Sequence, residues 1–173
     1  MQRIFLVGFM GAGKTTAGKE LAKQMNCSFV DLDFFIERRY HKTIRQIFEE
    51  KGEDVFRKME QKMLHEVAEF EDVIISTGGG TPCFYQNMLF MNEKGTTVYL
   101  KVSNEELFRR ISQHKSVRPM LKDFSGDSLF RFVEETMAKR KPFYEQARII
   151  YDAEIPDFAS DIGFLQRLLL KSV

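Results

Sequence analysis

The sequence contains few of the residues that build metal centres and disulfide frameworks. It has two cysteines, three histidines and no tryptophan in 173 residues. Cys27 and Cys83 form neither a metal-ligand spacing nor a disulfide pattern, which predicts a reduced, cytoplasmic compartment. His41, His65 and His114 fit no metal-ligand spacing either, and we interpret them as surface residues.

The sequence also lacks an excess of charge and a long apolar run. Lysine and arginine number 26 against 25 aspartates and glutamates, which argues against nucleic acid or an anionic membrane as the main partner. No apolar stretch reaches membrane-spanning length. The apolar segment Met1–Met10 runs into a glycine-rich motif, so we expect a core strand there rather than a signal peptide. The length predicts one compact domain over residues 1–173, and the absence of a sustained exposed apolar stripe favours a monomer.

Apolar runs of strand length alternate with helical patterns along the chain. This alternation predicts an α/β fold, a parallel five-stranded sheet with helices on both faces. The expected strands are Arg3–Val7, Ser28–Asp31, Val73–Thr77, Thr96–Val102 and Arg148–Tyr151. Ligands of such folds bind at the edge formed by the carboxyl ends of the strands, so the residues that follow each strand are the first functional candidates.

Two regions depart from the alternation. Residues 33–70 carry helical patterns with no strand between them, with a capping-box sequence at Thr43-x-x-Gln46 and a helix end at Gly52, before a further helix over Glu53–Phe70. Residues 112–125 are polar and basic, and we interpret them as a lid over a nucleotide site.

The most informative motif is the P-loop, Gly8-Phe9-Met10-Gly11-Ala12-Gly13-Lys14-Thr15, a complete G-x-x-x-x-G-K-[ST] sequence. It follows an expected strand and precedes an expected helix over Thr16–Met25. Backbone N–H groups of such a loop and the helix N-terminus attract an anion. Lys14 is expected to reach the β- and γ-phosphates of a bound nucleotide and Thr15 to ligate Mg²⁺. The alternative is a glycine-rich turn without a ligand.

Two carboxylates follow the second expected strand. Alternation along an extended segment sends Asp31 and Asp33 to the same side. Asp31 is a candidate for the Mg²⁺ shell, and Asp33 for accepting a proton from a substrate hydroxyl. In the alternative interpretation, Asp33 only caps the helix that follows.

Arginines and glycines supply the remaining candidates. Arg57 and Glu60 are three residues apart on an expected helix. They form either a solvated surface ion pair, or a pair in which Glu60 orients the guanidinium of Arg57 to bind the carboxylate of a ligand. Gly78–Gly80 permits positive φ and close approach of the backbone to a ligand, or forms a simple turn. Arg118 in the lid region is either a phosphate ligand or a solvated loop charge. Arg140 either points inward or is a helix-end cation, and Pro142 predicts that the chain kinks or restarts beside it.

These pieces together resemble the shikimate kinase family. The pieces that carry the resemblance are Gly8–Thr16, Asp31-Leu32-Asp33, Gly52-Glu53 with Phe56-Arg57-x-x-Glu60, Ser76–Gly80, Val117–Leu121 and Arg140-x-Pro142-x-Tyr144. The resemblance implies a nucleoside monophosphate kinase-like fold with strand order 2-3-1-4-5, a shikimate-binding helical insertion over about residues 33–61 and a lid over about 112–125. It also implies Mg²⁺-dependent transfer of the γ-phosphoryl group of ATP to the 3-hydroxyl of shikimate.

The resemblance assigns roles to individual residues. The ATP site it implies comprises Gly11, Ala12, Gly13, Lys14, Thr15, Thr16, Arg110, Arg118 and Pro156. The shikimate site it implies comprises Asp33, Arg57, Gly79, Gly80 and Arg140, with both arginines on the carboxylate. Lys14, Asp33 and Arg118 would be catalytic, and Thr15 and Asp31 would serve Mg²⁺.

Two other functions remain open at this point. A gluconate or nucleotide kinase would share the fold, although a nucleotide acceptor needs a base pocket, whereas two arginines and an aspartate suit a polyhydroxy acid. A nucleotide-dependent switch without an acceptor would leave the arginines and the triple glycine unexplained.

Overall fold

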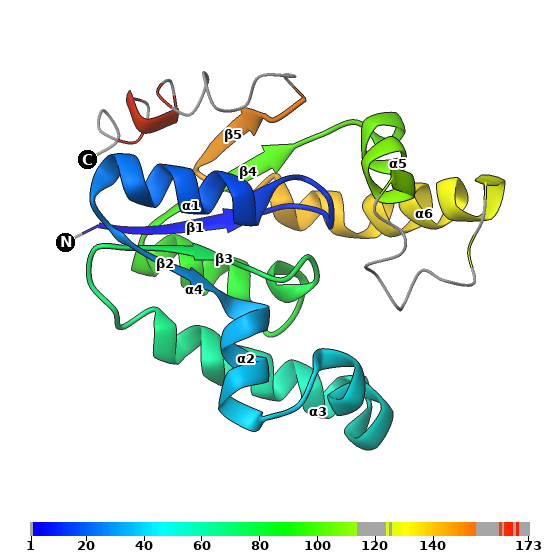
Figure 1. Ribbon diagram of the computed structural model, residues 1–173, viewed down its shortest axis with the longest axis horizontal. Coiled ribbons are helices and arrows are strands. Elements are labelled where there is room, and N and C mark those ends of the chain that lie inside the picture. The colour runs from blue at the N-terminus through cyan, green and yellow to red at the C-terminus, as the bar shows by residue number, and fades with distance from the viewer. Residues whose placement is uncertain are drawn as a thin grey trace.

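A parallel sheet of five strands forms the centre of the computed structural model, in the order β2-β3-β1-β4-β5 (Figure 1). The structure describes residues 2–113, 124, 126–154, 163, 165–167 and 169. The strands are β1 (Arg3–Val7), β2 (Ser28–Asp31), β3 (Val73–Ser76), β4 (Thr96–Lys101) and β5 (Ile149–Asp152). The helices are α1 (Lys14–Met25), α2 (Leu32–Tyr40), α3 (Ile44–Val67), the 3-10 helix η1 (Thr81–Cys83), α4 (Asn87–Lys94), α5 (Asn104–Gln113) and α6 (Gly126–Tyr144).

The sheet confirms the predicted strand order and fold class. β1 and β2 have the predicted bounds, β3 and β4 each end one residue earlier than predicted, and β5 is shifted by one residue at both ends. β1 is the middle strand of the sheet, and four of its five residues are buried, as expected for a strand that is covered on both faces. All neighbouring pairs are parallel, so the carboxyl ends of the strands meet at one edge.

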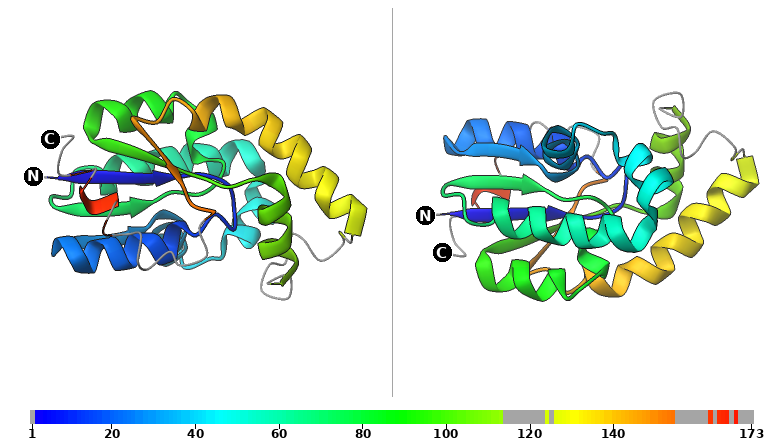
Figure 2. Two further views of the ribbon diagram at one scale, coloured as in Figure 1. Left: turned by 90° about the horizontal axis from the view of Figure 1, so that it is seen from above. Right: turned by 90° about the horizontal axis from the view of Figure 1, so that it is seen from below.

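Helices cover both faces of the sheet. α1 lies on one face, and α4 and α6 lie on the other (Figure 2). On the second face, the fully buried ring of Tyr144, the last residue of α6, packs 5.2 Å from that of Tyr99 in β4. Tyr99 therefore fixes the end of α6 against the sheet. None of the helices in the described part of the chain has the length and apolarity to span a bilayer.

α2 and α3 form a helical pair beside the β2 edge (Figure 1). The capping box is confirmed: the Thr43 hydroxyl accepts from the Gln46 backbone, and the Gln46 side chain accepts from the Thr43 backbone. The predicted helix end at Gly52 is a kink within α3, where the backbone adopts φ 78° and ψ 171°. Only glycine takes such angles without strain, so this residue sets the direction of the second half of α3.

Two local predictions were wrong. α1 begins at Lys14 rather than Thr16, so the last residues of the P-loop motif already form the first helical turn. We expected the chain to kink or restart at Pro142, but α6 continues through it to Tyr144. Pro142 lies in the last turn, so only two residues of α6 follow the point at which its missing N–H leaves a helical hydrogen bond unmade.

A close approach between β1 and the start of β4 gives a stability prediction. A Cβ at Gly95 would overlap the carbonyl oxygen of Arg3 and lie 2.9 Å from its Cβ. We expect Gly95→Ala to lower the free energy of unfolding by about 1–3 kcal/mol, because backbone must move to make room. Chemical denaturation measures this change.

The matched control is Gly163→Ala, where the nearest heavy atom to the new methyl group would lie 3.8 Å away. It should leave the stability within about 0.5 kcal/mol of the parent protein. Equal stability of the two variants would contradict the packing described for Gly95.

Candidate active site

The P-loop connects β1 to α1 at the carboxyl edge of the sheet. Gly13 caps α1 with φ 94°, and the helix begins at Lys14. The buried Lys14 ammonium donates to the carbonyl oxygens of Gly8 and Phe9, both at 2.8 Å. The loop therefore has a defined shape in which Lys14 already lies at the anion-binding end of α1. Gly11 and Ala12 form the turn of the loop, and Thr15 and Thr16 are exposed in the first turn of α1.

A hydroxyl and a carboxylate meet beside this loop. The Thr15 hydroxyl donates to Oδ2 of Asp31 at 2.8 Å. Oδ1 of Asp31 accepts from the Phe34 backbone N–H at 3.3 Å, so Asp31 is the N-cap of α2. Oxygen ligands of this kind are what Mg²⁺ prefers, and a hydroxyl beside a carboxylate fits it. Within the described ranges, no group of three or more His, Cys, Asp or Glu side chains could hold a metal ion.

Asp33 lies in the first turn of α2 rather than in an extended segment. The strand alternation used to place it beside Asp31 was therefore wrong, although the two carboxylates are close enough to interact. Burial, together with the nearby carboxylates of Glu60 and Asp31, raises the pKa of Asp33 to about 6, against the opposing effect of Lys14. A carboxylate with a raised pKa holds a proton more readily than an ordinary one. Asp33 is therefore suited to accept a proton near neutral pH.

The triple glycine brings the other site residues together by its lack of side chains. A Cβ at Gly78 would lie 2.8 Å from Oδ1 of Asp33, and one at Gly80 would lie 2.6 Å from Nη2 of Arg57. A Cβ at Gly79 would lie 3.1 Å from Nη1 of Arg140. None of the three glycines has positive φ, so the predicted reason for them was half right. They serve close approach rather than an unusual backbone conformation.

Arg57 and Glu60 form a buried ion pair, so the interpretation as a solvated pair was wrong. Arg57 is 8% exposed and Glu60 1% exposed, and Nη1 of the arginine donates to Oε2 of the glutamate at 2.9 Å. Oε1 of Glu53 accepts hydrogen bonds from Nε and Nη2 of Arg57, at 3.2 and 3.1 Å. The ring of Phe84 lies 4.3 Å from the Arg57 guanidinium carbon. This guanidinium is fixed on two edges and one face.

Arg140 lies between the triple glycine and the P-loop. Its guanidinium carbon is 5.7 Å from the ring centre of Phe9 in the P-loop. One turn along α6, the Tyr144 hydroxyl donates to the carbonyl oxygen of Gly79 at 2.6 Å. Burial raises the pKa of Tyr144, while Arg140 acts against this rise. The end of α6 thus holds the backbone of the glycine turn and directs a cation toward the P-loop.

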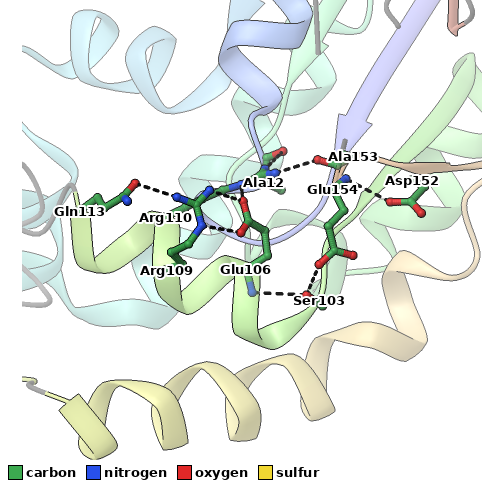
Figure 3. Close-up of polar contacts among 9 residues, drawn as sticks. All are labelled: Ala12, Ser103, Glu106, Arg109, Arg110, Gln113, Asp152, Ala153 and Glu154. Atoms are coloured by element: carbon green, nitrogen blue, oxygen red, sulfur yellow. Dashed lines mark hydrogen bonds and ion pairs between the residues drawn. The ribbon is translucent and has the colours of Figure 1, made fainter. Parts of the chain in front are cut away.

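Arg110 connects α5 to two other segments at the same edge (Figure 3). Its Nη2 donates to the carbonyl oxygen of Ala153 after β5 at 2.9 Å, and its Nη1 donates to that of Ala12 in the P-loop at 3.5 Å. Nε donates to Glu106 at 2.6 Å. The neighbouring Arg109 lies on the helix surface with a side chain 57% exposed, whereas the side chain of Arg110 is 22% exposed.

Sequence reasoning missed several supporting residues. Glu53 could have been found from its spacing of four residues to Arg57 on a helix. Thr81 and Phe84 carry no local signal, because their contacts with Glu60 and Arg57 are tertiary. Arg118, Pro156 and most of the predicted lid lie outside the described residues.

Comparison with known proteins gives a consistent result. The profile of the family described as "SKI: Shikimate kinase" matches residues 10–160. The chain is 59% identical to a shikimate kinase of Parabacteroides distasonis over 99% of both chains. It resembles the crystal structure of the shikimate kinase from Bacteroides thetaiotaomicron, with a TM-score of 0.95, 51% identity and 98% coverage of each chain. It also resembles that from Acinetobacter baumannii in complex with shikimate, with a TM-score of 0.89, 32% identity, and coverage of 99% and 94%.

The raised pKa of Asp33 predicts a trade between function and stability. Its pKa of about 6 exceeds the ordinary 3.8, so folding binds protons between these values and the carboxylate destabilises the protein above pH 6. Asp33→Asn should therefore raise the free energy of unfolding by up to about 3 kcal/mol at pH 8, and by about half as much at pH 5. Thermal unfolding at both pH values measures the difference.

Asp54→Asn is the control, because Asp54 is an exposed carboxylate of α3. It should change the midpoint of unfolding little at either pH. If Asp33→Asn were no more stable than the parent protein at pH 8, Asp33 would not be a strained carboxylate.

Proposed function

The chain belongs to the shikimate kinase family, and from this premise we propose how its residues share the reaction. The enzyme transfers the γ-phosphoryl group of ATP to the 3-hydroxyl of shikimate, giving shikimate 3-phosphate and ADP, in aromatic amino acid biosynthesis. One observation carries the assignment of residues. The triple glycine turn lies within contact distance of Asp33, Arg57 and Arg140, and Gly79 also faces Gly8 of the P-loop.

Arg57 and Arg140 bind the carboxylate of shikimate in this proposal. Both guanidinium groups lie against the glycine turn, and Glu53 and Glu60 leave part of the donor set of Arg57 for a ligand. The backbone of Gly79 and Gly80 lines the same wall. A rigid, bidentate donor selects a planar carboxylate, which neither a neutral sugar nor a nucleobase offers.

Asp33 receives the proton of the 3-hydroxyl, or orients that hydroxyl toward phosphorus. With a pKa of about 6, it is mostly ionised at neutral pH and can accept a hydrogen bond. Phosphoryl transfer proceeds through a loose transition state, so positioning contributes more than proton abstraction. The position of Asp33, close to both Gly78 and Asp31, lies between the acid-binding end and the phosphate end of the site.

The P-loop from Gly11 to Thr16 and Lys14 bind the phosphates. Lys14 exchanges its contacts with the carbonyl oxygens of Gly8 and Phe9 for phosphate oxygens, so its charge arrives without a large movement of the backbone. Arg110 lies beside the adenine, with Pro156 near it, and Arg118 of the lid serves the transferred phosphoryl group.

Mg²⁺ fits the pair formed by Thr15 and Asp31. The hydroxyl would ligate the ion, and the carboxylate would hold a water of its shell. When bound, the ion supplies charge neutralisation at the phosphates. Asp31 also caps α2, so the residue that serves the ion fixes the start of the helix that carries Asp33.

The remaining parts of the proposal concern organisation. We propose one P-loop kinase domain with a shikimate-binding insertion over about residues 33–61 and a lid over about 112–125. The lid would close over the substrates and exclude water. Both cysteines are free thiols, which agrees with the proposed cytoplasmic location. We further propose that the enzyme acts as a monomer, without a nucleic acid or membrane partner.

The acceptor and the role of Arg57 are tested together. ADP formation from Mg-ATP should rise with shikimate and not with gluconate or AMP. Arg57→Ala should reduce kcat/KM for shikimate by roughly 30- to 1000-fold, equal to about 2–4 kcal/mol, and leave ATP binding unchanged. Arg45→Ala, which removes an exposed arginine of the same helix, is the control. Unchanged kcat/KM in Arg57→Ala would show that another group binds the carboxylate.

The metal assignment has its own test. Asp31→Asn should raise the Mg²⁺ concentration for half-maximal activity by roughly tenfold, because an amide attracts the ion less than a carboxylate does. The amide oxygen can still cap α2, so the midpoint of thermal unfolding should stay near that of the parent protein. A Mg²⁺ titration of initial rates measures the effect. An unchanged Mg²⁺ requirement would remove Asp31 from the metal site.

A further inference from the structure

The Arg57–Glu60 ion pair also has a buried hydroxyl beside it, that of Thr81, to which the proposed reaction gives no role. The Thr81 hydroxyl donates to Oε1 of Glu60 at 2.6 Å, and the other oxygen of that carboxylate accepts from Arg57 at 2.9 Å. Thr81 and Glu60 are 0% and 1% exposed. Each oxygen of this buried carboxylate therefore has a donor of its own, and the pair of bonds fixes its rotation about the last side-chain torsion.

The position of Thr81 is itself fixed by the chain around it. It is the first residue of η1, directly after the triple glycine, and its N–H donates to the carbonyl oxygen of Gly78 at 3.2 Å. The buried Asn87 side chain donates to the carbonyl oxygen of Thr81 at 3.0 Å. A Cβ at Gly78 would lie 3.0 Å from the Thr81 hydroxyl, so the glycine leaves room for it. These contacts hold the backbone of Thr81 at the place from which its hydroxyl reaches Glu60.

The same turn supports Arg57 from a second direction. The ring of Phe84, the residue after η1, lies 4.3 Å from the Arg57 guanidinium carbon. A guanidinium that faces an aromatic ring is attracted to it and loses freedom to tilt. The segment from Thr81 to Phe84 thus restrains the guanidinium of Arg57 in two ways. Thr81 acts on its edge through Glu60, and the Phe84 ring packs on its face.

We propose that Thr81 is a positioning residue for the acid substrate: its hydroxyl orients Glu60, and Glu60 orients the Arg57 guanidinium that binds the carboxylate. The inference rests on the proposed role of Arg57. A carboxylate bound by two parallel N–H groups tolerates little rotation of the guanidinium, so an error of orientation weakens binding of the acid more than it slows transfer of the phosphoryl group. A serine preserves the hydroxyl, whereas a valine preserves the shape without it.

The first test compares Thr81→Val, Thr81→Ser and the parent enzyme in steady-state kinetics. Thr81→Val should raise KM for shikimate by roughly 5- to 20-fold and leave kcat and KM for ATP within about twofold. Thr81→Ser should restore KM to within about twofold of the parent value. A parental KM in Thr81→Val, or an equal defect in both variants, would overturn the proposal. Should Thr81→Val fail to fold, Thr81→Ala takes its place.

Two further variants separate positioning from general loss of stability and from failure of the Arg57 assignment. Thr97→Val removes another fully buried, hydrogen-bonded threonine hydroxyl, in β4, and should leave KM for shikimate unchanged. Arg57→Lys should raise KM by itself, and adding Thr81→Val to it should have little further effect, because the geometry to be preserved is already lost. Full additivity would overturn the Thr81 proposal alone. An unchanged KM in Arg57→Lys would instead refute the role of Arg57.

Discussion

The buried ion pair between Arg57 and Glu60 is the interaction on which the proposed shikimate-binding half of the site depends. Two charges removed from water are stable only when their hydrogen-bonding groups are satisfied. The fold meets this condition with Glu53 on the far edge of the guanidinium, Thr81 on the carboxylate and the Phe84 ring on the guanidinium face. These contacts come from α3 and from the segment after β3, which are distant in sequence and adjacent only in the folded chain.

The close approach of backbone to side chain explains why a run of glycines follows β3. Gly78, Gly79 and Gly80 each face a different charged residue, at distances that leave no space for a methyl group at Gly78 and Gly80. The side chains of Asp33, Arg57 and Arg140 therefore pack directly against the backbone of this turn. The Tyr144 hydroxyl stabilises this backbone by donating a hydrogen bond to the carbonyl oxygen of Gly79.

The sequence predicted those features that depend on neighbours along the chain. The P-loop, the strands and the Thr43 capping box are local patterns, and the structure confirms all three. It could not predict the burial of Arg57, since this depends on η1 and on packing across the molecule. Asp33 was expected near Asp31 for a reason that proved wrong: β2 ends at Asp31, and the first turn of α2 brings Asp33 back toward it. Thr81 had no local pattern, because a lone threonine after glycines indicates only a turn.

The contacts of Arg110 bear on the entropic cost of nucleotide binding. This one side chain ties α5 to the P-loop at Ala12 and to the segment after β5 at Ala153. Three pieces of chain at the P-loop edge of the sheet, where we propose that the nucleotide binds, are therefore joined before any ligand arrives. Less conformational entropy is then lost on binding than if each piece ordered separately.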